Sequence, residues 1–223
     1  MRFYDVGGKF LPSVTTILSI VRKPALETWR GELGNEEADR LMHEAGDMGS
    51  SVHTLCEAVH YGVPWCSNDP NIVAMVESYE RWFNTYVRKV LHVEKLVVNL
   101  PYGYAGRVDL VAVLKGDRLP SVIDLKTGKG IWPEMPLQLS AYKEALPFKT
   151  KRRVIVHLDK VHPGRLATKD DSDFSHDHGY DYRMFLYAKE LWTYFNGAVS
   201  PRKEDIIKPK ETEYERDSTG TGS

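Results

Sequence analysis

The most informative part of this 223-residue sequence consists of two short stretches, GRVDL at residues 106–110 and VIDLKTG at residues 122–128. Both are rich in β-branched and apolar residues, and the turn sequence Lys-Gly-Asp-Arg at 115–118 separates them. This pattern predicts two strands, 106–114 and 121–127, that pair antiparallel across a short turn.

Each of these two strands carries a carboxylate. The side chains of Asp124 and Lys126 stand on one face of their strand, about 6–7 Å apart at a rise of about 3.3 Å per residue, and Asp109 lies on the neighbouring strand. Two carboxylates on one sheet face repel each other unless a cation lies between them, and Mg²⁺ is the default hard cation for oxygen ligands. The alternative is that both aspartates face solvent and Lys126 is their ion-pair partner. The depletion of Asp from strand interiors disfavours that alternative.

The spacing of apolar residues predicts the elements around this hairpin. We expect a hairpin at 2–10, a short helix to about residue 21, helices at 25–33, 35–44, 46–61, 71–91, 137–146 and 181–196, and further strands at 94–100 and 153–159. Residues 162–180 are expected to form a polar loop. Together these elements predict an α/β fold in a single domain over residues 1–200, followed by a charged, disordered tail over 201–223.

Composition excludes several classes of protein. The chain has 42% hydrophobic and 27% charged residues, which is typical of a globular protein with its own core. The 30 basic and 31 acidic residues give a net charge of −1, which excludes a strongly basic nucleic-acid binder but not a local basic groove. The first ten residues lack the apolar core of a signal peptide, and no stretch of about 18 apolar residues occurs. We therefore expect a cytoplasmic protein without a membrane segment.

Two further motifs give the hairpin a family resemblance. GSSVH at residues 49–53 lies upstream of it, and QLSAY at 138–142 lies downstream. In this order the motifs resemble those of the PD-(D/E)xK nuclease superfamily, in particular its RecB-like exonuclease branch, over about two thirds of the chain. The resemblance implies a restriction-endonuclease-like mixed β-sheet flanked by helices, with the N-terminal helices forming one wall of the cleft.

The resemblance also implies roles for individual residues. Its implied catalytic residues are Asp109, Asp124 and Lys126, and its implied metal ligands are His53, Asp109, Asp124 and the backbone carbonyl of Leu125. Gln138 and Tyr142 resemble the helix pair that supports the site and contacts nucleic acid. The implied cofactor is Mg²⁺ or Mn²⁺, because a bound cation lowers the pKa of an attacking water and a lysine balances the developing phosphate charge.

Several other polar residues each have two alternative interpretations. Thr127 either binds a phosphate or ends its strand, and Arg107 either contacts DNA or forms an ion pair. Ser13 and Thr15 either donate to a phosphate or cap a helix. Glu94 is either a further acidic residue of the site or a charge on an edge strand.

These observations predict a metal-dependent DNA exonuclease of recombination, repair or replication, similar to stand-alone phage-type enzymes. The chain has two cysteines, Cys56 and Cys66, whereas the iron–sulfur cluster of some members of this family needs four. Trp132 either stacks on bases of a single strand or packs in a core or lid. Two alternatives stay open, an endonuclease of the same fold and a non-catalytic nucleic-acid-binding module. The expected partner is DNA with ends; the polarity of cleavage, the oligomeric state and a helicase or recombinase partner are left open.

Overall fold

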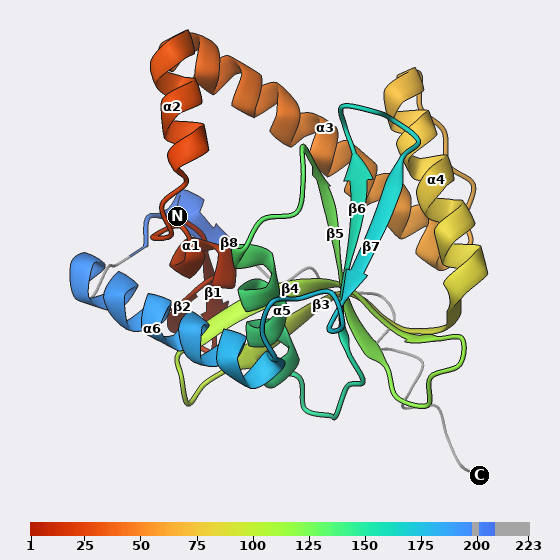
Figure 1. Cartoon of the computed structure of the whole chain (residues 1–223). Coiled ribbons are helices and arrows are strands. Elements are labelled where there is room, and N and C mark those ends of the chain that lie inside the picture. Colours follow the sequence, from red (N-terminus) through yellow and green to blue (C-terminus); the bar gives the residue numbers. More distant parts are fainter. Residues whose placement is uncertain (198–200, 208–223) are drawn as a thin grey trace.

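A computed structural model describes residues 1–197 and 201–207 of the chain. At its centre lies a five-stranded sheet in the order β3-β4-β5-β6-β7 (Figure 1). Its strands are β3 (Val87–Asn99), β4 (Tyr104–Leu114), β5 (Ser121–Gly128), β6 (Arg153–Asp159) and β7 (Leu166–Asp170). β5 and β6 are parallel and the other neighbours are antiparallel, so the sheet is mixed. The predicted α/β fold with a mixed sheet flanked by helices is confirmed.

Helices cover both faces of this sheet (Figure 1). One apolar core joins the sheet to α1 (Val14–Leu18), α5 (Glu134–Ala145) and α6 (His178–Asn196). A second core joins the opposite face to α4 (Pro70–Tyr86) and the second half of α3 (Asn35–Tyr61). Burying the apolar stripe of each helix against the sheet is the main source of stability in such a layered fold.

A small sheet lies beside the first one, in the order β2-β1-β8. β1 (Phe3–Val6) and β2 (Lys9–Pro12) form the predicted N-terminal hairpin, and β8 (Ile206–Ile207) runs parallel to β1. The prediction of a disordered tail from residue 201 is therefore wrong for its first residues. Residues 206–207 form a strand, and Asp205 forms an ion pair with the N-terminal amine at 3.0 Å. The rest of the predicted tail, 208–223, lies outside the described residues.

Three predicted element boundaries differ from the structure. The two helices expected at 35–44 and 46–61 are one 27-residue helix, α3. The helix expected at 71–91 ends at Tyr86, and the chain continues directly into β3. Within the expected loop at 162–180, residues 166–170 form the edge strand β7.

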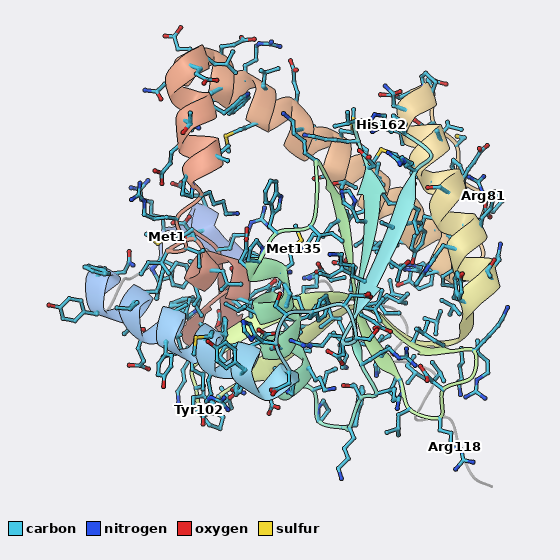
Figure 2. All side chains as sticks on the ribbon, viewed as in Figure 1. Met1, Arg81, Tyr102, Arg118, Met135 and His162 are labelled. Atoms are coloured by element: carbon cyan, nitrogen blue, oxygen red, sulfur yellow. The ribbon has the colours of Figure 1, made fainter. Side chains whose placement is uncertain are left out.

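An arm extends from the body of the fold. α2 (Pro24–Leu33) and the first half of α3, to residue 47, form this arm (Figure 1). Most of its side chains project into solvent (Figure 2). Every residue of α2 is exposed or half-buried. The ion pair between Arg30 and Asp39, at 2.7 Å, joins the two helices of the arm.

The central sheet forks between β4 and β5. Their ladder holds three residue pairs and ends at Leu110↔Ile123. The next residues are Asp109 on β4 and Asp124 on β5, and from there β4 continues beside β3 while β5 continues beside β6. The two aspartates of the predicted site thus lie where the strands separate.

β3 and β4 change faces at the level of this fork. Val93 and Leu110 pack in the core under α3 and α4, whereas Val97 and Val108 pack in the core under α5. Residues an even number apart share a face in a regular strand, so both strands are irregular between these positions. Glu94, with a φ of +48°, lies at this irregularity. Irregular strand positions of this kind re-aim side chains and are common beside functional sites.

Among residues 1–197 and 201–207, no helix combines the length and the apolar character needed to cross a lipid bilayer.

Candidate active site

Asp109 links the two strands across the fork. Its Oδ2 accepts a hydrogen bond from the backbone N–H of Leu125 at 2.7 Å. This bond replaces a main-chain bond where the ladder between β4 and β5 has ended. It fixes the Asp109 carboxylate beside Asp124, the residue before Leu125.

Asp124 is the centre of a buried polar network. Its carboxylate is only 2% exposed; Oδ1 accepts from Gln138 Nε2 at 3.0 Å, and Oδ2 lies 2.6 Å from Lys126 Nζ. Gln138 also donates to the hydroxyl of Tyr142 at 3.0 Å and accepts from Lys126 at 3.2 Å. Both N–H groups and the oxygen of the Gln138 amide are therefore hydrogen-bonded. These bonds hold the side chains of Asp124, Lys126 and Tyr142 in defined positions.

α5 reaches the sheet because Gly106 on β4 has no side chain. A Cβ at residue 106 would collide with Cε1 of Tyr142, closer than any real contact. Gln138 and Tyr142 are one helical turn apart and share the face of α5 that meets the sheet. The glycine that precedes the predicted Arg-Val-Asp sequence thus has a packing role in this site.

Burial and charge set the ionisation of the Asp124–Lys126 pair. Burial raises the pKa of Asp124 to about 6, with Lys126 opposing the shift and Asp109 adding to it. Burial lowers the pKa of Lys126, but the attraction of Asp124 and Asp109 outweighs it, so that the pKa of Lys126 is raised. Lys126 is therefore a lasting positive charge at neutral pH, held next to two carboxylates.

His53 is brought to the fork by a close approach of α3 to β5. Gly49 is buried, and a Cβ there would lie 2.8 Å from Oγ1 of Thr127. His53 follows one turn later on the same face of α3, and its Nδ1 lies 3.9 Å from Oδ1 of Asp109. The small residue in GSSVH thus lets the helix present its histidine to the aspartate.

His53, Glu94 and Asp109 form a cluster that suits a metal ion. Each offers one ligand atom, and these atoms all lie within 4.8 Å of one another. The three side chains are half-buried, and they come from α3, β3 and β4. Two carboxylate oxygens and one imidazole nitrogen are ligands that Mn²⁺ or Mg²⁺ accepts, with the nitrogen favouring Mn²⁺.

Glu94 lies on the edge strand β3 and also beside the residues of the predicted site. The pairs Val93↔Leu110 and Lys95↔Val108 place Glu94 at the same level of the sheet as Asp109. The sequence signal for this was weak, since it required the register of β3, whose first residues read as a continuation of the preceding helix.

Other predicted site residues have different surroundings. Arg107 pairs with Glu94 at 3.7 Å, as in the ion-pair reading. Ser13 caps α1 by accepting from the N–H of Thr16, and its hydroxyl lies 3.0 Å from that of Thr15, as in the capping reading. Thr127 faces Gly49 of α3. Contacts of these residues with DNA stay predictions.

Two predicted metal ligands are placed differently from His53 and Asp109. The Asp124 carboxylate is directed to Gln138 and Lys126, next to the cluster rather than within it. Leu125 contacts Asp109 through its N–H, and ligation by its carbonyl stays a prediction. Of the predicted ligands, the structure therefore brings His53 and Asp109 together, and Glu94 joins them.

Comparisons with known proteins give little on the family. No family model matches the chain, and no curated protein matches it. The chain is similar to a solved structure described as "Crystal structure of SSO0001", with 17% identity and a TM-score of 0.41, over 83% of this chain and 77% of that chain. We infer nothing about function from a likeness at this level.

Proposed function

We propose that the protein is a divalent-metal-dependent deoxyribonuclease that hydrolyses phosphodiester bonds, acting from DNA ends. The observation that carries the proposal is the meeting of Lys126 and Asp124 with the cluster of His53, Glu94 and Asp109 at one fork of the sheet. A divalent cation with a lysine beside it suits phosphodiester hydrolysis, because the cation lowers the pKa of a bound water and the lysine stabilises the charge of the phosphate in the transition state.

The residues present fit a divalent cation. The donor set of His53, Glu94 and Asp109 has two negative charges and a spacing that a single ion can span. A bound cation supplies a water of lowered pKa and positive charge for the phosphate oxygens. Asp109 is held for this task by the N–H of Leu125, and Glu94 is balanced by Arg107.

Lys126 provides positive charge rather than a base. Its raised pKa keeps it protonated, and its side chain is 22% exposed at the edge of the network. A protonated amine at this place stabilises the negative charge that a phosphate gains in the transition state, and it orients a water by donating a hydrogen bond. Gln138 holds the amine in place by accepting from it.

Asp124, Gln138 and Tyr142 position the lysine. Because the Gln138 amide bonds both the carboxylate and the tyrosine hydroxyl, it cannot flip without losing two hydrogen bonds. Such preorganisation keeps the charge where the phosphate needs it, at no reorganisation cost during the reaction. Tyr142 is therefore a positioning residue.

The test is cleavage of end-labelled linear and covalently closed circular DNA with Mg²⁺, Mn²⁺ or chelator. Release of label from linear DNA alone, abolished by chelator, is the result that we expect. Cutting of circles assigns an endonuclease of the same site. Absence of cleavage on all substrates, together with Mn²⁺ binding undetectable by calorimetry, contradicts the proposal.

A further inference from the structure

The arm is attached to the body beside the end of β5. Lys23, the residue before α2, pairs with Glu134 at the start of α5 at 2.7 Å. On α2 itself, the ring of Trp29 has Lys129 Nζ at 5.9 Å from its centroid. Trp29 is half-buried, whereas Lys129 is an exposed residue of the loop that follows β5. These contacts hold α2 over the exit of β5 from the sheet.

This place lies next to the proposed active site. Glu134 and Gln138 are one turn apart on α5, about 6 Å at a rise of about 1.5 Å per residue, and the charge of Glu134 acts on Lys126. Lys129 follows Lys126 by three residues. The carbonyl of Gly128 accepts at 3.0 Å from the ring of His157 on β6, which fixes the end of β5. Lys129 thus leaves the sheet at a defined point close to the catalytic lysine.

The loop that contains Lys129 also contains a tryptophan, Trp132. Trp132 is 47% exposed, and its backbone N–H donates to the sulfur of Met135 at the start of α5. The loop that follows β5 therefore carries an exposed indole, and α2 places the half-buried indole of Trp29 against Lys129 of the same loop. Aromatic rings beside a cation are surfaces on which nucleic-acid bases stack.

Several carboxylates of the arm form ion pairs with arginines of the arm or with Arg22, which precedes it. Three arginines pair with them, in the pairs Arg22–Glu27, Arg30–Asp39, Arg40–Glu37 and Arg40–Glu44. Glu134 is balanced by Lys23. The charge of Lys129, by contrast, faces the π-surface of Trp29. An anion that approaches this loop therefore meets a cation held by an aromatic ring.

We propose that Trp29, Lys129 and Trp132 form a subsite that binds single-stranded DNA next to the active site. The proposal rests on the proposed function and names the substrate class: a strand with unpaired bases. A cation–π contact at an exposed site contributes about 0.5–1 kcal/mol, whereas stacking of a base on an aromatic ring contributes about 1–3 kcal/mol. A base therefore displaces Lys129 from the ring of Trp29, and the released amine binds a neighbouring phosphate. Bases within a duplex have both faces covered and cannot stack in this way.

The test is the affinity of a fluorescent oligothymidylate, measured by anisotropy in chelator so that the DNA stays intact. We expect Trp29→Ala to weaken binding about tenfold, Trp29→Phe to retain most of the affinity, and Lys129→Ala to weaken it less than Trp29→Ala. Tyr194→Ala is the matched control, since Tyr194 is an 82% exposed aromatic on α6. An abasic oligonucleotide of equal length keeps the phosphates but has no bases, so Trp29→Ala and wild type should bind it equally.

The outcomes separate this inference from the proposed function. Equal affinity of Trp29→Ala and wild type for oligothymidylate overturns the subsite, and so does an equal loss on the abasic strand, because that loss reports a structural role. If wild type cleaves DNA and Trp29→Ala binds normally, the nuclease stands and the subsite is wrong. If Trp29 governs binding but wild type cleaves nothing, the subsite stands and the proposed hydrolysis is wrong.

Discussion

Gln138 on α5 donates to the buried carboxylate of Asp124 on β5 at 3.0 Å, across the interface between helix and sheet. The same amide accepts from Lys126. One side chain thus determines the positions of both the carboxylate of Asp124 and the ammonium group of Lys126. A helix residue that makes no proposed contact with the metal therefore controls the geometry of the reaction.

Gln138→Ala removes both of these bonds. It leaves buried polar groups without partners, so we expect the free energy of unfolding to fall by about 1–3 kcal/mol. In cleavage assays kcat should fall about 10–100-fold, the range known for partners of metal-site residues, with KM little changed. Urea unfolding and steady-state kinetics measure the two effects. Lys143→Ala on the same helix is the control, and a full kcat in Gln138→Ala would refute the positioning role.

The approach of α3 to β5 predicts a coupling between Gly49 and Thr127. A Cβ in Gly49→Ala meets Oγ1 of Thr127 at 2.8 Å, so we expect the helix to shift, with loss of stability and of Mn²⁺ affinity through His53. Thr127→Ala removes the clash. In that background Gly49→Ala should be harmless or stabilising by about 0.5–1 kcal/mol, since Ala is the better helix residue. A double-mutant cycle by urea unfolding measures the coupling; additive effects would exclude the contact.

The strained backbone of Glu94 predicts a trade between stability and metal binding. A non-glycine residue at φ +48° costs about 1–2 kcal/mol. Glu94→Gly should therefore raise the free energy of unfolding by up to about 1 kcal/mol, because glycine adopts this conformation freely. Calorimetry should show that Glu94→Gly weakens Mn²⁺ binding. Glu94→Gln keeps the strained backbone and should also weaken Mn²⁺ binding. Unchanged Mn²⁺ affinity in both variants would remove Glu94 from the ligand set.

His60 predicts a loss of stability in acid. It lies between α3 and α4, with Nε2 2.5 Å from the hydroxyl of Tyr79, and burial lowers its pKa to about 4. In the unfolded chain the pKa is about 6.5, so between pH 6.5 and 4 the unfolded state binds a proton that the folded state does not. The contribution is complete above pH 6.5 and falls by about 3 kcal/mol as the pH approaches 4.

Urea unfolding of wild type and His60→Gln across this range isolates the contribution of His60. We expect the variant to have a flatter pH dependence, because Gln does not titrate. Parallel curves for the two proteins would show that His60 titrates normally.

The hairpin and its helix were predictable because their signals are local. β5 has eight residues, and within them lie several β-branched residues and the Asp-x-Lys spacing. A turn sequence directly precedes the strand. Gln138 and Tyr142 are linked by helical spacing alone. The geometry that joins these elements, such as the close approach at Gly106, follows from tertiary packing and was not visible in the sequence.

The missed elements have weak or misleading local signals. β7 is mostly exposed and polar, since it is an edge strand that pairs through its backbone with β6. Val87 and Val90 continue the helical spacing of α4, yet they lie in β3 because tertiary pairing with β4 overrides the period. The error in this boundary also obscured the register that places Glu94 beside Asp109.

The most direct test of the proposed chemistry is the single-turnover cleavage rate of Lys126→Ala on labelled linear DNA at saturating Mn²⁺, with Mn²⁺ affinity measured on the same protein. We expect a rate at least about 100-fold below wild type, as for loss of a preorganised charge, with Mn²⁺ binding retained through His53, Glu94 and Asp109. A rate equal to that of wild type would contradict the assignment of Lys126 and, with it, the proposed active site.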